Sequence, residues 1–168
     1  MLFHTSLHLP PAAVPDRDGA SRVMRQPNYR IGWYIPHQLA ALTHFHPEVT
    51  NEDFMGVLHE GQALFESVKD AFSIIIDNRV VAMSAPVSLS QMRQVVPYMH
   101  HPLLRWVIVI KPEELALDTT NLPIETEGTV HLKNVSSLAE ALSYLQQVTS
   151  NIQWHLADET FFSNILSA

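Results

Sequence analysis

The sequence predicts an α/β fold in which helices pack on a single mixed sheet of about five strands. Two short apolar runs, Phe72 to Ile76 and Trp106 to Ile110, are rich in β-branched residues. Such runs are typical of strands that are covered on both faces in a parallel sheet. A helix signal lies between them, so the segment forms a strand, helix, strand crossover. With 168 residues, of which 46% are hydrophobic, the chain can bury one substantial core.

The first part of the chain divides into an arm, a hairpin and a helix. Residues 1–28 contain four prolines and predict an extended or disordered N-terminal arm. Arg30 to Ile35 and Leu39 to Phe45 are β-prone runs separated by a short turn, which is typical of an antiparallel hairpin. Thr50 and Asp53 then form a variant capping box that opens a helix. Gly61 falls on the apolar face of that helix, where we expect it to bring helix and sheet close together.

The second part supplies two more capped helices. Ser88 and Gln91 form a capping box, and Pro97 is expected to end or kink the helix that it opens. The acidic segment from Lys111 to Gly128 has no clear period and is interpreted as irregular. Thr129 to Leu132 predicts a short last strand, and the Ser137-x-x-Glu140 box opens a helix through Val148.

These signals predict three regions along the chain. Residues 1–28 form the arm, residues 29–150 form the α/β domain, and residues 151–168 form an amphipathic helical tail. The apolar residues of that tail would leave an exposed patch unless it docks, which favours a homodimer. They are Leu156, Phe161, Phe162, Ile165 and Leu166.

Composition limits the function classes. Seventeen acidic residues against ten basic ones give a formal charge of -7, and the absence of a basic cluster argues against nucleic-acid binding. The chain contains no cysteine, so it has neither a disulfide framework nor a thiolate nucleophile, and a reducing cytoplasm is compatible with it. No apolar run approaches the roughly 18 residues of a membrane span. Residues 1–11 lack a basic n-region and a long apolar h-region, so we expect no secretory signal there.

The order of these elements resembles a STAS-type domain, the fold of anti-sigma-factor antagonists and of the cytoplasmic tails of sulfate transporters. The resemblance covers about residues 29–148 and rests on the hairpin RIGWYIPHQLAALTHF, the strand FSIIID, the helix SLSQMRQVV, the strand RWVIVI and the closing VHLKNVSSLAEALSYLQQV. It implies a regulatory module without a cofactor. In signalling members a partner kinase phosphorylates a serine in an Asp-Ser-Gly-like sequence. Here MSAPVSLS replaces that sequence, and Ser84 or Ser88 is the nearest equivalent. The segment from Lys111 to Gly128 also departs from the family, which usually has a longer helix there.

The loop after the first buried strand is the candidate recognition site. In open α/β sheets, functional groups gather at the carboxyl ends of the strands. Five polar residues lie at or after the carboxyl end of the Phe72 to Ile76 run and are the candidates. They are Asp77, Asn78, Arg79, Ser84 and Ser88. Asp77 is either a general base or an acceptor for the amides of its own turn, and Arg79 either binds an anion or pairs with a nearby acid.

Four histidines are considered as metal ligands or as helix caps. His44 and His46 carry imidazoles and the nearby Glu48 carries a carboxylate, and both groups can bind zinc. Two histidines at this spacing do not make a zinc site by themselves, so we expect no metal. His100 and His101 follow the second helix, where an imidazole interacts favourably with the helix end.

Two classes of function fit these observations. The first is a non-catalytic regulatory or protein-interaction module, because the chain lacks a Gly-rich phosphate loop, a nucleophile elbow and a His-Glu-x-x-His motif. The second is a protein or enzyme that binds a small molecule, either anionic or lipid-like, through the Asp77 to Ser88 loop, with His100 or His101 titrating near neutral pH. A deep pocket with convergent polar groups would favour the second class.

Overall fold

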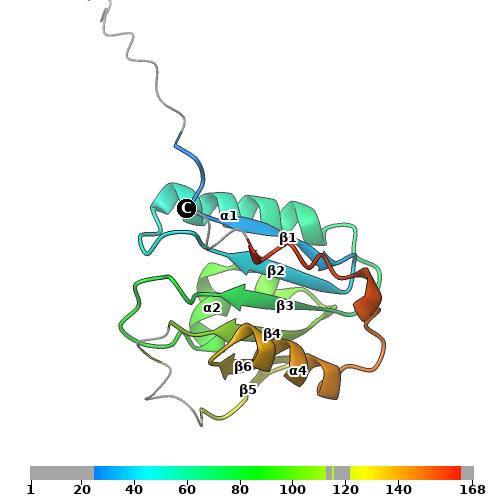
Figure 1. The fold of residues 1–168 in the computed structure, drawn as a ribbon. Helices are drawn as coiled ribbons and strands as arrows, with labels where there is room; N and C mark the ends of the chain where they lie inside the picture. The colour runs from blue at the N-terminus through cyan, green and yellow to red at the C-terminus, as the bar shows by residue number, and fades with distance from the viewer. Residues whose placement is uncertain (1–24, 113–114, 116–121, 164–168) are drawn as a thin grey trace, which may run out of the picture.

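The computed structural model describes residues 25–112, 115 and 122–163. The chain begins with a hairpin and then alternates between helices and strands (Figure 1). The elements are β1 (Arg30–Ile35), β2 (Leu39–Thr43), α1 (Asn51–Phe65), β3 (Phe72–Asp77), α2 (Leu89–Val95), the 3-10 helix η1 (Pro97–His100), β4 (Leu104–Ile110), β5 (Glu125–Glu127), β6 (Val130–Val135), α4 (Leu138–Val148) and the 3-10 helix η2 (Trp154–Leu156).

A single mixed sheet organises the described residues, which confirms the predicted fold class. Its order is β1-β2-β3-β4-β6-β5. The four central strands β2, β3, β4 and β6 run parallel, while β1 and β5 pair antiparallel with their neighbours at the two edges. The sheet has six strands, so the expected number of about five was one too low. The additional strand, β5, lies in the acidic segment that was interpreted as irregular.

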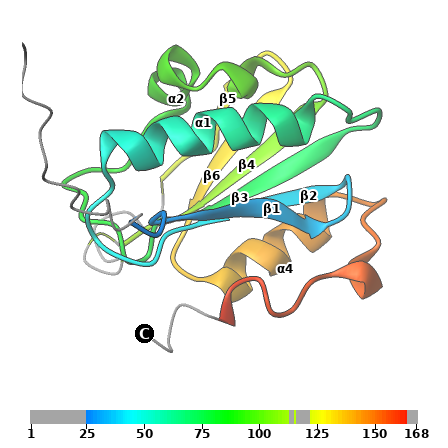
Figure 2. The same ribbon diagram turned by 90° about the horizontal axis from the view of Figure 1, so that it is seen from above.

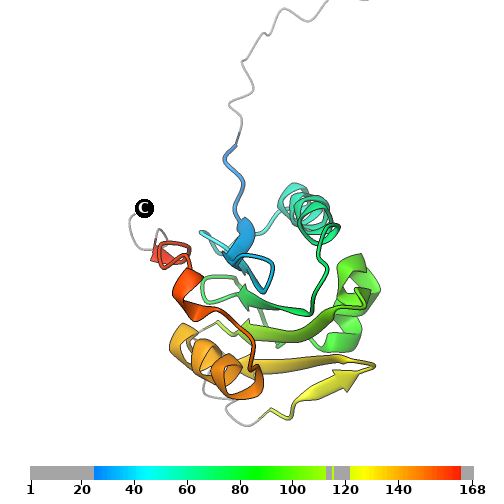
Figure 3. The same ribbon diagram turned by 90° about the vertical axis from the view of Figure 1, so that its right-hand side faces the viewer.

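Helices cover the sheet on both faces (Figures 2 and 3). On one face Ile74 and Val107 join the core beneath α1, α2 and η1. On the other face Ile75 and Ile108 join the core beneath α4 and the C-terminal segment. Successive residues of β3 therefore point into different cores, as the period of a strand requires. This double coverage explains why β3 and β4 are continuous apolar runs. Within the described residues, no helix has the length and apolar character needed to cross a bilayer.

The predicted capping residues mark the helix starts. Thr50 caps α1 and Ser88 caps α2, each in a reciprocal box with the residue three positions later. Ser137 accepts the Glu140 N–H at 3.1 Å. Val96 separates α2 from Pro97, and the chain continues as η1 because proline fits the first turn of a new helix.

Gly61 lies against Tyr98 of η1, whereas its position in the sequence predicted a contact with the sheet. It lies on the buried face of α1, but a Cβ there would approach Cε1 of Tyr98 in η1 to 2.5 Å. The close approach therefore joins helix to helix, and the expected contact with the sheet was wrong. Tyr98 is itself buried, 7% exposed, so its ring has little room to move.

The two ends of the domain also differ from the sequence interpretation. Asn28 was assigned to the arm, yet it is 1% exposed and belongs to the folded core. The C-terminal segment forms only η2 and turns over its described part, so the expected amphipathic helix is wrong for residues 154–163. Phe161 and Phe162 are buried in this chain's own second core. The intramolecular contact removes the exposed patch that they were expected to form, while Ile165 and Leu166 lie outside the described residues.

Replacing Gly61 with valine should destabilise the domain, because the new side chain overlaps the buried Tyr98 ring. We expect the free energy of unfolding in urea to fall by about 1–3 kcal/mol, the usual cost of overpacking. Ala63→Val is the matched control, since Ala63 is exposed on the same helix. A loss in Gly61→Val no larger than in Ala63→Val would contradict the Tyr98 contact, because helix propensity alone favours valine over glycine.

Candidate functional site

The carboxyl ends of the four parallel strands bring several polar residues to one edge of the sheet, on the left of Figure 1. Thr43 at the end of β2 is in register with Asp77 at the end of β3, and Asp77 is in register with Ile110 at the end of β4. Lys111 follows directly, and its N–H donates to the carbonyl of Val135 in β6. The predicted position of the site at this edge therefore coincides with a real cluster of polar groups.

Asp77 is the centre of this cluster. Its Oδ1 accepts the backbone N–H of Arg79 at 3.1 Å and the Nε–H of the same residue at 2.9 Å. Its Oδ2 accepts the Arg79 Nη2 at 2.8 Å and the Thr43 hydroxyl at 3.1 Å. Asp77 is only 2% exposed. All four acceptor positions of the carboxylate are therefore used within the chain.

This bonding decides between the two interpretations of Asp77 and Arg79. A carboxylate whose acceptor positions are all occupied has no free position for a substrate proton, so Asp77 acts as the anchor of the turn. Its hydrogen bond to Arg79 raises the pKa of that guanidinium. Arg79 pairs with Asp77 in a bidentate manner, which ties its charge to the protein and leaves little of it for an anionic ligand.

The three other predicted site residues have different environments. Asn78 is buried, and its N–H donates to the carbonyl of Ile110 at 2.9 Å. Ser88 caps α2 by accepting the Gln91 N–H at 3.1 Å. Ser84 is exposed in the middle of the loop. The structure therefore brings Asp77, Asn78 and Arg79 together at the base of the loop and places Ser84 on its exposed part.

A neighbouring loop is held by Asn28, which sequence reasoning placed in the arm. The Asn28 Oδ1 accepts the N–H groups of Phe45 and His46, and its Nδ2 donates to the carbonyls of His46 and Glu48. Its backbone N–H donates to Oδ1 of Asp53, the buried capping residue of α1. Burial raises the pKa of Asp53. The hydrogen bonds from Asn28 and Thr50 and the charge of Arg25 lower that pKa by more than burial raises it, so it lies below its ordinary value.

The histidine positions do not assemble a metal site among the described residues. His44 is buried, with its Nδ1 3.1 Å from the carbonyl oxygen of Asn28, whereas His46 is exposed. Within the described ranges, no three His, Cys, Asp or Glu side chains are grouped so that they could hold a metal ion. His100 has a capping role, because its Nε2 lies 2.8 Å from the carbonyl oxygen of Arg93 in the last turn of α2.

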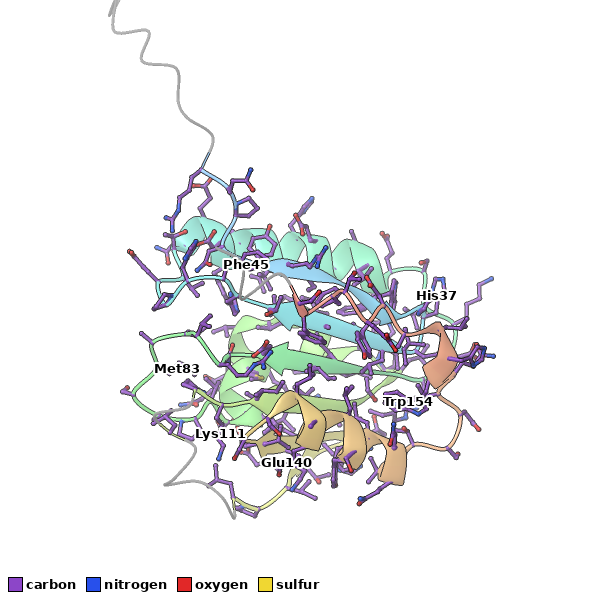
Figure 4. All side chains as sticks on the ribbon, in the orientation of Figure 1. His37, Phe45, Met83, Lys111, Glu140 and Trp154 are labelled. Carbon is purple, nitrogen blue, oxygen red and sulfur yellow. The ribbon has the colours of Figure 1, made fainter. Side chains whose placement is uncertain are left out.

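Lys111 is a residue of this edge that sequence reasoning did not select. It is 2% exposed, and burial lowers the pKa of its ammonium while the charge of Glu140 opposes that shift. Figure 4 shows Lys111 and Glu140 at the same end of the molecule. The lysine directly follows an apolar strand, and this position was the available signal.

Asn134 is the second residue that the sequence analysis missed. It lies near the end of β6, paired with Val109, and lines a cavity of about 280 Å³ together with Val87, Ser88 and Glu125. A larger cleft of about 570 Å³ lies at the opposite, amino edge of the sheet, near the β1–β2 turn and the segment after α4. Of these two cavities of the described residues, the predicted loop borders the smaller one.

Comparison with protein-family models, with curated proteins and with solved structures finds no match to this chain. The geometry of the described residues is thus the basis for a functional assignment.

Removing the Arg79 side chain should destabilise the fold even though Arg79 is 38% exposed, because the buried Asp77 carboxylate would lose its ionic partner. We expect Arg79→Ala to lower the free energy of unfolding by about 1–3 kcal/mol. Lys69→Ala is the control, since Lys69 is an exposed cation. Urea unfolding measures both variants, and a change in Arg79→Ala no larger than in the control would contradict the anchoring role.

His44 should make the domain less stable at mildly acidic pH. Burial lowers the pKa of His44 in the folded state, so the unfolded chain binds the proton more readily. The stabilisation is complete above the ordinary histidine pKa of 6.5 and is lost as the pH falls below it. Chemical unfolding at about pH 7.5 and about pH 5.5 should show this loss in the wild type and a smaller one in His44→Gln. The exposed-site variant His59→Gln should behave as the wild type does, and an unchanged loss in His44→Gln would assign the effect to other groups.

Proposed function

We propose that this chain is a non-catalytic regulatory module of the STAS type that binds a protein partner through the loop of residues 78–88. The observation that carries the proposal is the chemistry of that loop. From Val80 to Ser88 it contains no charged residue, although the chain as a whole carries a charge of -7. Ala82, Ser84 and Ala85 are exposed in it. Exposed surface depleted of charge is characteristic of the centre of protein–protein interfaces.

The loop is also well positioned to act as a preformed contact surface. Asp77 and Arg79 fix its start, and the Ser88 cap fixes its end on α2. In its middle, the Ala82 N–H donates to the carbonyl of Pro47 at 3.1 Å, which joins it to the loop that Asn28 holds. Figure 4 labels Met83 in this loop at the left of the sheet. A loop held at several points loses less conformational entropy on binding.

The STAS assignment rests on the order of elements and on the place of the loop. A hairpin comes first, and the loop in question joins β3 to the capped helix α2. Ser84 is the exposed counterpart of the serine that signalling members phosphorylate, whereas the Ser88 hydroxyl already accepts the Gln91 N–H. We therefore assign the recognition role to Ser84 in preference to Ser88.

The alternative, an enzyme that uses Asp77 as a base, has less support. The acceptor positions of the Asp77 carboxylate are occupied by donors of Thr43 and Arg79, and the Arg79 guanidinium is paired with that same carboxylate. An anionic substrate would have to displace that pair. The described geometry thus favours a structural role for both residues.

Two further parts of the proposal concern assembly and location. A homodimer stays a prediction, although Phe161 and Phe162 no longer support it because they pack into their own chain. In a homodimer the uncharged loop would be the contacting surface. The absence of cysteine agrees with a role in the reducing cytoplasm.

Placing charge on the loop should abolish partner binding without unfolding the protein. We expect the double variant Ala82→Asp/Ala85→Asp to reduce capture of specific partners from an extract of the source cells by at least about tenfold, which corresponds to about 1.4 kcal/mol. Both positions are exposed, so stability should change by no more than about 0.5 kcal/mol each. Quantitative mass spectrometry of the captured proteins measures the effect.

Ala63→Asp on α1 provides the control for each of the two loop substitutions, because it adds the same single charge at an exposed alanine away from the loop. Partners that both variants retain would exclude the loop as the contact. Turnover of a small metabolite that disappears in Asp77→Asn would replace the proposal with the enzyme alternative. Sedimentation of the wild type and of the double variant shows whether a second copy is the partner.

A further inference from the structure

A second candidate site lies on the α2 side of the same sheet edge. The cavity of about 280 Å³ is lined by both apolar and polar residues. Its apolar lining comes from Pro86, Val87, Leu122 and Pro123, and its polar lining from Ser88, Glu125 and Asn134. A mostly apolar concavity with a few polar groups is the usual form of a small-molecule site, and this volume lies just below the usual range of about 300–1,000 Å³.

Asn134 supplies the unusual feature of this cavity. The residue is 8% exposed, and its Oδ1 is buried without a hydrogen-bond partner among the described residues. Nearly all buried polar atoms in proteins are paired, because an unpaired one costs free energy. Apart from Arg93 Nε, Asn134 Oδ1 is the only such buried side-chain atom in the described part of the chain. It therefore needs an explanation, and a bound donor provides one.

Sheet register brings Glu125 to the same face as Asn134. Glu125 of β5 pairs antiparallel with Leu132, two residues before Asn134 in β6. Residues directly opposite in such a pair point to the same face, as do residues two apart in a strand. Leu132 belongs to the core beneath α2, so all three side chains are on the α2 face. The Glu125 Oε2 accepts the Leu89 N–H at 3.2 Å, which holds the carboxylate beside the cavity.

We propose that this cavity binds a small apolar molecule with a primary ammonium group. The ammonium would pair with the carboxylate of Glu125 and, after a rotation of the Asn134 side chain that turns its solvent-shielded Oδ1 toward the cavity, donate to that oxygen. The hydrocarbon part would lie against Pro86, Val87 and Leu122. This site is independent of the protein contact proposed for the loop, because it uses the cavity side of residues 86–88 and not the exposed positions 82, 84 and 85.

The charge of the residues that line the cavity favours a cationic ligand. The seven described residues that line it include one acid and no base, and the chain is acidic as a whole. An anion would face the Glu125 carboxylate and the Asn134 carbonyl oxygen, both of which are acceptors. A neutral alcohol could satisfy Asn134 but would gain nothing from the carboxylate. An ammonium group matches both oxygens at once.

NMR titration with matched probes tests the ligand class. Benzylamine should shift the backbone amide signals of Ser88 and Leu89 and the side-chain amide of Asn134. Benzyl alcohol and benzyltrimethylammonium should bind at least about tenfold more weakly, since the first lacks the charge and the second lacks the N–H donor. Benzoate should not bind. Equal binding of benzylamine and benzyl alcohol, or the absence of shifts at these residues, would overturn the proposal.

Two substitutions separate a binding role from a structural one. Asn134→Leu should abolish benzylamine binding yet raise the midpoint of thermal unfolding by several degrees, because it removes an unpaired buried polar group. A lowered midpoint would indicate that Asn134 has a structural partner such as water, and would contradict the proposal. Glu125→Gln keeps an acceptor for the Leu89 N–H and should weaken benzylamine at least about tenfold while leaving benzyl alcohol unchanged. Unchanged benzylamine binding in this variant would exclude the ion pair.

Discussion

The fold depends on covering both faces of its four parallel strands. A parallel sheet whose strands are apolar throughout cannot leave either face in water. The face opposite α1 is covered by α4 over β4 and β6, and by the C-terminal segment over the hairpin (Figure 3). That segment is held by polar contacts as well as by its phenylalanines. The Asp158 N–H donates to the carbonyl of Tyr34, and the Arg30 guanidinium donates to the carbonyl of Phe161 and lies over its ring.

This constraint explains why some elements could be predicted from the sequence and others could not. The starts of α1 and α2 were predictable because a capping box is a local interaction between residues three positions apart. The Glu125–Glu127 strand was not, because three residues with two glutamates carry no apolar alternation, and only pairing with β6 makes them a strand. The C-terminal segment was misread for a related reason. Its apolar residues fit a helix, but they dock through turns because the hairpin face needed a cover.

The sequence was sufficient to predict which edge of the sheet carries the polar cluster, but not which groups bind one another there. Asp77 could be placed there because it ends an apolar run, and its turn-forming role was one of the two interpretations considered. Its hydrogen bond with Thr43 could not be predicted, because Thr43 lies 34 residues earlier and meets Asp77 only through the register of β2 and β3. Asn134 did give a signal, which was not used: it stands at the position where the alternation of Val130 and Leu132 predicts an inward, apolar residue. What the sequence could not show is that no described residue pairs with its Oδ1.

The two faces of this edge differ in how their buried polar groups are satisfied, and this difference bears on function. On the α4 face, Asp77 receives every hydrogen bond that it can accept, so the protein needs nothing else there. On the α2 face, the Asn134 carbonyl oxygen has no partner among the described residues, and an acid lies beside it. A satisfied group accounts for stability, whereas an unsatisfied one leaves a hydrogen bond that a ligand can supply. Asp77, which was selected from the sequence, therefore has a structural role in the described geometry, and Asn134, which was not selected, is the better candidate for binding.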